Sequence, residues 1–265
     1  MTVLTDSTAN RNTDAPPIPL ERLIKVELRK LVDTRAGFWL TASIALIAAI
    51  VMVVMLISAR NHPEDLSFSA FFGSMNIPTG IILPIMAILL VTSEWSQRNG
   101  LTTFTMEPRR DRIILAKLGA SLIAVVGAVL VALLLGAVGT AVAGLIYGDP
   151  AGSWSFTGAN LVNSLVLQVF GVLLGFGFAA LILNTPGAIV AYFALPSALS
   201  LLAGLVPAFG DHIGEWIDTA RTNEAFMSSE WASPGEWARL LVSGAIWIGI
   251  PLGLGILRIL RAEVK

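Results

Sequence analysis

The sequence predicts an all-α polytopic membrane protein with six transmembrane helices. Its 265 residues are 55% hydrophobic and 13% charged, with a mean hydropathy of +0.78, whereas about a quarter of the residues of a soluble domain are charged. Long apolar stretches alternate with short polar segments, and each stretch is near or above the roughly 20 residues that cross a bilayer core. The basic residues gather in a few of the polar segments. These observations indicate one membrane-embedded domain over residues 20–265.

The chain begins with a polar segment, residues 1–19, which is rich in Thr, Asn, Asp and Pro. It lacks the apolar run of a signal peptide or a span. We expect a disordered cytoplasmic tail.

Residues 20–35 are predicted to form an amphipathic helix along the inner membrane surface, because their apolar side chains fall on one helical stripe and basic ones lie opposite. Glu27 is the exception, since it projects near the middle of the apolar stripe. It either pairs locally with Lys30, points into the lipid headgroups, or meets a basic residue of the segment 98–112.

The six predicted spans follow from the apolar stretches. They cover residues of about 38–57, 68–91, 113–145, 159–183, 188–206 and 239–257. The second contains Pro78 and Pro84, and bends at these residues should face the bundle interior, where neighbours satisfy the freed carbonyls. The third would be about 50 Å long if wholly helical, so it tilts or protrudes. In the fourth, Asn163 and Gln168 either form interhelical hydrogen bonds or contact a transported molecule.

Residues 207–236 combine acidic residues with aromatic ones, notably Trp216, Phe226 and Trp231. Aromatic side chains are typical of the membrane interface, where one end of the ring is apolar and the other is wet. We expect a re-entrant or interfacial segment on the outer leaflet that covers the external end of the bundle before the last span.

The distribution of basic residues predicts the orientation. Of the 17 Lys and Arg residues, six lie in 11–35, five in 98–117 and three in 258–265, so that 14 share one side. Basic residues near span ends stay in the cytoplasm. We therefore expect a multi-pass protein of the cell membrane with both termini cytoplasmic.

The cytoplasmic segment between the second and third spans is the most distinctive. If residues 95–105 are helical, Leu101 and Phe104 share a face, and Pro108 ends the helix. Such a helix needs a partner groove or a headgroup layer for its apolar side. The alternative is an ordinary basic loop without a docking role.

An acidic residue, Arg-x-Gly, a Thr-Thr-Phe segment, Pro-Arg-Arg and a Lys opening the next span follow one another here. This pattern resembles the cytoplasmic loop of export-type (type 2) ABC transporter permeases, of the short six-span, actinobacterial-like kind. The ending RILRAEVK and the order of elements from about residue 20 are similar too. In that family the loop forms a coupling helix that docks on a separate ATPase subunit. The resemblance implies coupling roles for Glu94, Arg98, Gly100, Leu101, Thr103, Phe104, Pro108, Arg109 and Arg110, with Lys117 at the matching position of the next span.

Several kinds of chemistry are excluded. There are no cysteines, and the two histidines lie far apart without a metal-binding spacing. No Gly-rich phosphate-binding loop is present, so we expect no catalytic, cofactor or metal residues, and any ATP and Mg to be bound by a partner ATPase. No span carries a clearly buried charge, because Glu94 and Lys117 sit at span ends. Ion-coupled secondary transport, which commonly relies on such charges, is therefore the alternative, followed by a non-transport polytopic membrane protein.

The resemblance implies a permease subunit that is not itself an enzyme. It would pair with a second permease copy or paralogue, as a homo- or heterodimer in the bilayer, and with two ATPase subunits. The expected cargo is a lipophilic or amphipathic drug, antibiotic or lipid, as in multidrug efflux and antibiotic resistance. Asn163 and Gln168 are the candidate pathway residues. No role in nucleic-acid binding is expected, since the formal net charge is only -1.

Overall fold

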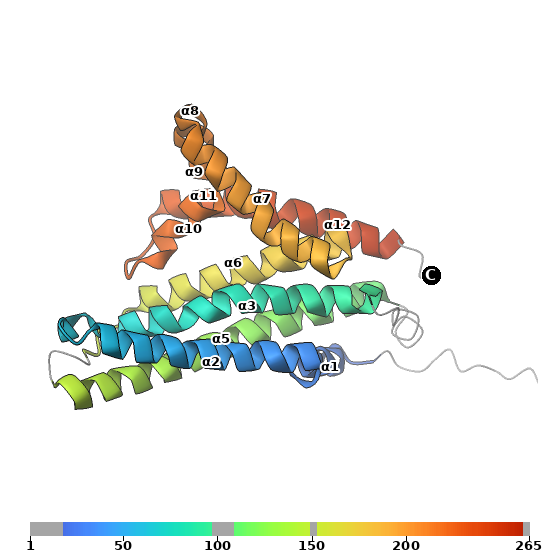
Figure 1. The fold of residues 1–265 in the computed structure, drawn as a ribbon. Helices are drawn as coiled ribbons and strands as arrows, with labels where there is room; N and C mark the ends of the chain where they lie inside the picture. The colour runs from blue at the N-terminus through green and yellow to red at the C-terminus, as the bar shows by residue number, and fades with distance from the viewer. Residues whose placement is uncertain (1–17, 97–108, 149–152, 262–265) are drawn as a thin grey trace, which may run out of the picture.

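Six helices in the described part of the chain are long and apolar enough to cross a membrane, as predicted. The structure is a computed structural model that describes residues 18–96, 109–148 and 153–261. Within these ranges there is no strand, only an isolated bridge between Ser67 and Ser153. The long helices are α1 (Leu20–Asp33), α2 (Arg35–Ser58), α3 (Phe68–Ser96), α5 (Arg110–Tyr147), α6 (Gly158–Ile182), α7 (Thr185–Leu205), α11 (Pro234–Gly244) and α12 (Ile250–Arg261) (Figure 1).

Short helical turns connect or interrupt these helices. They are η1 (Pro63–Asp65), α8 (Pro207–Phe209), η2 (Gly210–Gly214), α9 (Glu215–Ile217), α10 (Thr219–Glu224), η3 (Ala225–Met227) and η4 (Ala245–Gly249).

Each predicted span corresponds to one helix or, for the last span, to the continuous α11, η4 and α12. That last helix contains a π-helical turn at η4, which the apolar pattern did not predict. α3 extends five residues beyond the predicted end of the second span, to Ser96. α5, with 38 residues, is about 57 Å long at 1.5 Å per residue.

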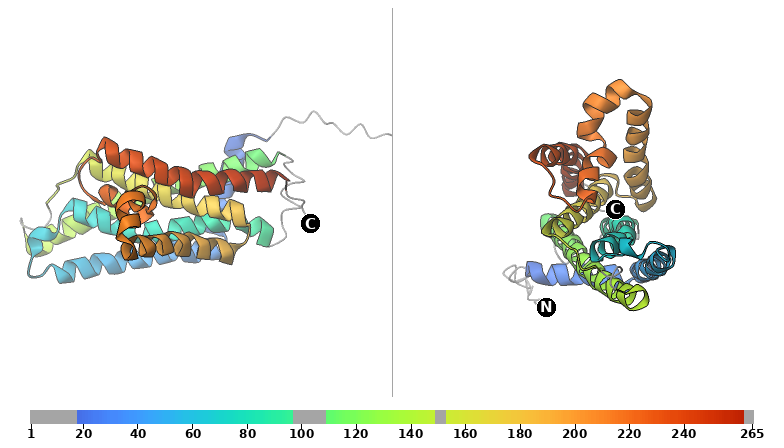
Figure 2. Two further views of the ribbon diagram at one scale, coloured as in Figure 1. Left: turned by 90° about the horizontal axis from the view of Figure 1, so that it is seen from above. Right: turned by 90° about the vertical axis from the view of Figure 1, so that its left-hand side faces the viewer.

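α1 lies across the bundle (Figure 2, right), at the end where α3 ends and α5 begins (Figure 1). The predicted helix at 20–35 ends at Asp33, because Thr34 caps the start of α2 by accepting a hydrogen bond from Gly37 N. A Cβ at position 37 would lie 2.0 Å from Leu31 O. The tight corner between α1 and α2 therefore requires glycine. We call this end of the bundle the α1 end; the opposite end is where α3 and α6 begin.

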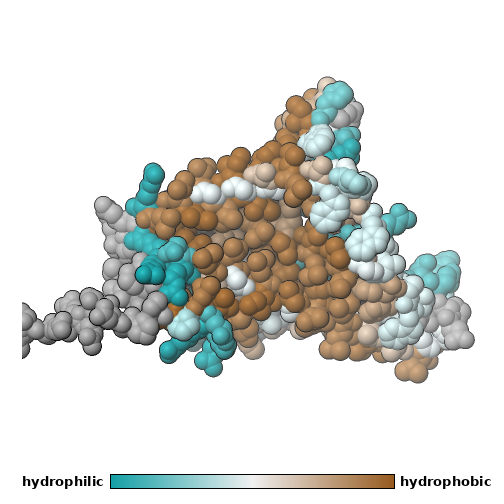
Figure 3. Space-filling view, turned by 180° about the vertical axis from the view of Figure 1, so that it is seen from behind, coloured by the Kyte–Doolittle hydropathy of each residue, from teal (hydrophilic) through white to brown (hydrophobic). Residues whose placement is uncertain are grey.

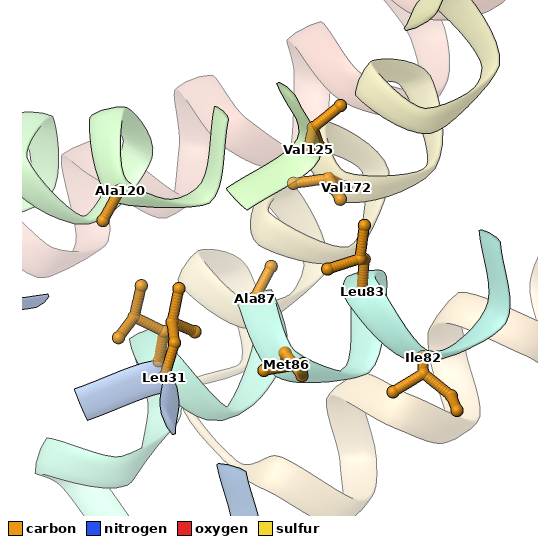
Figure 4. Close-up of a cluster of buried hydrophobic side chains, with 9 residues drawn as sticks. Leu31, Ile82, Leu83, Met86, Ala87, Ala120, Val125 and Val172 are labelled. Carbon is orange, nitrogen blue, oxygen red and sulfur yellow. The ribbon is translucent and has the colours of Figure 1, made fainter. Parts of the chain in front are cut away.

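α3 and α6 form the centre of the bundle and are its most buried spans. Pro78 and Pro84 of α3 are both buried, as expected for prolines that face the interior. A Cβ at Gly175 of α6 would lie 2.9 Å from Pro84 O, so the two helices pack closely at this glycine. Figure 4 shows the cluster that joins α1, α3, α5 and α6, made of Leu31, Ile82, Leu83, Met86, Ala87, Leu90, Ala120, Val125 and Val172.

The face of the bundle shown in Figure 3 is a broad apolar band with polar residues at its two ends. Most of α2 and α7 contributes to this exposed surface, since few of their residues are buried. In water such an area would drive association, and in a bilayer it matches the hydrocarbon core. The fold is thus that of a multi-pass membrane protein.

The segment between α7 and α11 folds back onto the bundle. α7 leans away from α3 and α6, α8 lies at the far tip, and α9 and α10 return toward the bundle (Figure 1). Asp218, which is 2% exposed, accepts hydrogen bonds from Ser200 of α7 and from Ala220 N. Trp247 Nε1 donates to Ile217 O at 2.6 Å. The segment is therefore part of the same packed unit and not a separate domain.

Candidate functional site

Four charged residues from three helices form a cluster at the α1 end. Lys117 Nζ of α5 lies 2.8 Å from Glu27 Oε2 of α1 and 3.0 Å from Glu94 Oε1 of α3. Lys30 Nζ of α1 lies 2.5 Å from Glu27 Oε1 and 3.2 Å from Glu94 Oε1. We call Glu27, Lys30, Glu94 and Lys117 the ion-pair cluster.

Three members of the ion-pair cluster are almost inaccessible to solvent. Glu27 is 5% exposed, Glu94 6% and Lys117 4%. Buried charges are tolerated when they are paired and hydrogen-bonded. The Lys117 ammonium meets this condition, since Leu90 O at 2.8 Å is a third oxygen beside the two carboxylates.

Lys30 is the outermost member of the ion-pair cluster. Burial lowers the pKa of its ammonium, but the attraction and hydrogen bonds of Glu27 and Glu94 outweigh this effect. The pKa of Lys30 is therefore raised above its ordinary value.

This cluster corrects two expectations. Glu94 and Lys117 do lie near the ends of their helices, but the expectation that they are not buried is wrong, because α1 folds across both and covers them. Of the three expectations for Glu27, the local pair with Lys30 is confirmed. The cation from a distant part of the chain is Lys117 of α5 and not an arginine of the described part of the segment 98–112.

The coupling residues predicted in the loop fall partly outside the described residues. The residues outside the described ranges are Arg98, Gly100, Leu101, Thr103, Phe104 and Pro108. Among the rest, Arg109 precedes α5 as its N-cap residue, and Arg110 Nη1 donates to Ile259 O of α12 at 2.7 Å. Glu94 belongs to the ion-pair cluster. The structure therefore places both flanks of the loop in contact with other helices.

A second feature is a cavity of about 640 Å³ toward the opposite end of the bundle. It lies between the first half of α3, α6, the middle of α7 and residues 219–229. Its volume falls in the range of about 300–1,000 Å³ that is typical of small-molecule sites. Every described residue that lines it is uncharged. We call this space the α3–α6–α7 cavity.

Gln168 is held rigidly at the wall of the cavity. Its Nε2 donates to Thr79 Oγ1 at 2.6 Å and to Asn76 O at 3.1 Å, with Asn76 Oδ1 at 3.3 Å. The Thr79 hydroxyl in turn donates to Asn76 O, and Asn76 Nδ2 donates to Phe72 O. Because two of the atoms facing Nε2 are oxygens that can only accept, the amide orientation is determined. Interhelical hydrogen bonding, one of the two expected roles of Gln168, is confirmed for its nitrogen.

Asn163 has a different environment. Its Nδ2 donates to Ser228 O at 3.1 Å and to Glu230 O at 2.8 Å. It thus attaches the segment between α7 and α11 to α6, and it does not line the α3–α6–α7 cavity. The structure therefore separates two residues that the sequence grouped as pathway candidates.

The three aromatic residues of that segment also differ in how exposed they are. Trp216 and Trp231 are 41% and 64% exposed, whereas Phe226 is 2% exposed. Phe226 packs in a cluster with Phe170, Leu174, Phe178 and Leu240, so the expectation of a ring at headgroup level is wrong for this residue. A sequence in which aromatic residues are spread among acidic ones does not indicate which aromatic side chains point into the protein and which point out of it.

Sequence reasoning missed several residues of these sites. The sequence pattern places Lys117 at a span end without a buried partner, and it does not single out Thr79, Ser164 or Asn223. The available signal was the spacing: Asn76 and Thr79 on α3, like Ser164 and Gln168 on α6, are polar residues three or four apart in apolar spans. No group of His, Asp or Glu residues suited to a metal ion occurs among the described residues.

No protein-family model matches the chain, and the search of curated proteins returns no match.

Proposed function

We propose that this chain is the membrane-spanning permease subunit of an ABC exporter, powered by ATP hydrolysis on a separate ATPase subunit. The observation that carries the proposal is the ion-pair cluster. Glu94 lies just before the segment 97–108, and Lys117 lies shortly after it. Glu94 pairs with Lys30 of α1, Lys117 pairs with Glu27 of α1, and Glu94 and Lys117 pair with each other. A force applied to that segment would therefore move α1, α3 and α5 together.

The partners follow from this mechanism. The sequence lacks a phosphate-binding loop, so ATP and Mg would be bound by two copies of an ATPase chain. A second permease copy or a paralogue would complete the pathway in the cell membrane. With an even number of spans, both termini lie on the side of the ATPases, where the basic residues are concentrated.

The proposed cargo is lipophilic or amphipathic, such as a drug, an antibiotic or a lipid. The α3–α6–α7 cavity supports this class, because its lining combines aromatic and aliphatic side chains with a few polar groups and no charges.

The test targets the proposed coupling helix at Phe104. Phe104→Ala should remove a buried aromatic anchor from the ATPase interface, and loss of such an anchor commonly costs about 2 kcal/mol or more, a weakening of roughly 30-fold. Copurification of the ATPase and stimulation of its ATP hydrolysis should fall accordingly. Phe38→Ala is the matched control, because Phe38 is 57% exposed on α2 at the same end of the bundle. Equal loss in both variants, or no loss in either, would contradict the coupling role.

A second function is favoured by one observation. Buried Lys117 and Glu94 lie within spans, and buried charges in spans are frequent in ion-coupled secondary transporters. In vesicles without an ATPase, this function requires uptake driven by an ion gradient and its loss in Glu94→Gln. The exporter function requires that uptake depend on ATP and the partner chain.

A further inference from the structure

Three residues that line the α3–α6–α7 cavity carry hydrogen-bond acceptors that nothing in the described chain satisfies. Gln168 Oε1, Ser164 Oγ and Asn223 Oδ1 are buried without a hydrogen-bond partner, and all three residues line the cavity. An unpaired buried carbonyl oxygen is costly. These atoms therefore indicate a ligand or solvent that donates hydrogen bonds to them.

Gln168 is the anchor of this arrangement. It is 4% exposed, and its amide nitrogen is engaged by Thr79 and Asn76 of α3. Its oxygen cannot exchange places with the nitrogen without facing Asn76 O and Oδ1, which only accept. Oε1 is thus a fixed acceptor. Ser164 lies one turn earlier on the same face of α6, so two polar side chains that line the cavity are neighbours on this helix.

The rest of the lining determines the chemical class of the ligand. Every described residue that lines the cavity is uncharged, so an ionic group would be buried there without a counter-charge. Apolar side chains that include Phe72, Ile77, Leu174 and Phe193 surround the polar pair. The site thus suits a neutral polar group beside an apolar body.

We infer that the α3–α6–α7 cavity binds a neutral amphipathic molecule whose polar head donates at least two hydrogen bonds, to Gln168 Oε1 and Ser164 Oγ. Its apolar part lies against the aromatic and aliphatic wall. This inference deepens the proposed function, on which it rests for the transport of the molecule. Binding itself needs only this chain.

The probe is a decanoyl monoglyceride that carries a diazirine on its acyl chain. Its head group is neutral and has two hydroxyl donors. The purified full chain in lipid nanodiscs, without any ATPase, is irradiated with the probe, and labelled residues are located by mass spectrometry. Label should concentrate on residues 69–81 and 164–174. Unlabelled monoglyceride should compete, whereas its dimethyl ether, with the same chain and no donors, should compete at least tenfold less well.

Two glycine variants form a matched pair. A Cβ at Gly73 meets nothing within 4 Å, and Gly73 lines the cavity. Gly73→Leu should therefore fold, fill the cavity and reduce specific labelling at least fivefold. A Cβ at Gly127 of α5 also meets nothing within 4 Å, but Gly127 is exposed away from the cavity. Gly127→Leu should label like the wild type.

Ser164→Ala tests the polar contact. Because Ser164 Oγ has no partner in the described chain, the variant should keep the thermal stability of the wild type. Its affinity for the monoglyceride should fall roughly three- to tenfold, the effect of one hydrogen bond.

Two results would overturn the inference: unchanged labelling in Gly73→Leu, or equal competition by the dimethyl ether, which would mean that only water satisfies the acceptors. Neither bears on the Phe104 experiment, since no ATPase is present. Conversely, a chain that binds no ATPase can still bind the monoglyceride.

Discussion

Lys117 of α5 donates a hydrogen bond to Glu27 of α1 at 2.8 Å, although the two residues are ninety positions apart in the chain. The contact lies inside the protein, with both residues at most 5% exposed. The ion-pair cluster around it contains two carboxylates and two ammonium groups. Charge is therefore balanced where α1, α3 and α5 meet.

We expect Lys117→Gln to be strongly destabilising. It leaves Glu27 and Glu94 with Lys30 as the remaining cation of the cluster, and breaking a buried pair typically costs about 3–5 kcal/mol. Lys30→Gln should cost clearly less, because the Lys30 side chain is 35% exposed and water can replace it. Thermal unfolding of the two variants in nanodiscs measures the difference. Similar losses in both would contradict the central position assigned to Lys117.

The contribution of Lys30 should be independent of pH from neutrality to pH 10.5. Its folded pKa lies above the ordinary value of 10.5. A raised pKa stabilises the fold fully below the unfolded value, and the contribution is lost as the pH rises through the folded value. The stability difference between the wild type and Lys30→Gln should therefore stay constant over that range and decline above it. A difference that already shrinks near neutral pH would show that Lys30 is not held by the two carboxylates.

Two glycines on α12 should respond very differently to the same substitution. A Cβ at Gly255 would lie 2.7 Å from Ala180 Cβ and from Leu181 N of α6, whereas a Cβ at Gly253 meets nothing within 4 Å. Gly255→Ala should separate the helices and cost about 1–3 kcal/mol through overpacking. Gly253→Ala should be neutral or slightly stabilising, because alanine favours helix. Chemical denaturation curves of the two variants test this, and equal stability would refute the close packing of α12 on α6.

Phe226 should behave as a core residue despite its acidic surroundings. Phe226→Ala removes a side chain that is 2% exposed, and we expect a loss of about 3–5 kcal/mol. Trp231→Ala, at a position that is 64% exposed, should change stability by about 0.5 kcal/mol or less. Shallow lipid quenchers should in turn quench Trp216 and Trp231 if these side chains lie at the membrane interface. Tolerance of Phe226→Ala would contradict its inward position.

The orientation in the membrane can be tested directly. A reporter fused after Pro108 or Lys265 should be cytoplasmic, and one inserted near Asn223 should be external, because 14 of the 17 basic residues lie on the first side. Labelling of position 108 from outside the cell would reverse the assignment and remove the basis for an ATPase at the α1 end.

The sequence alone determined the features that depend on neighbouring residues. A span needs only a sufficient length of apolar side chains, so all six helices were predictable. The pair between Glu27 and Lys30 needs only a spacing of three residues in a helix.

Only the tertiary structure decided which distant polar residues meet. Lys117 joins Glu27 and Glu94, and Gln168 joins Asn76 and Thr79, because helices far apart in the sequence cross at those positions. The same holds for the α3–α6–α7 cavity and for the inward Phe226. Hydropathy is the same for a polar side chain that faces a partner, a cavity or lipid, so these contacts depend on helix crossings that local composition does not encode.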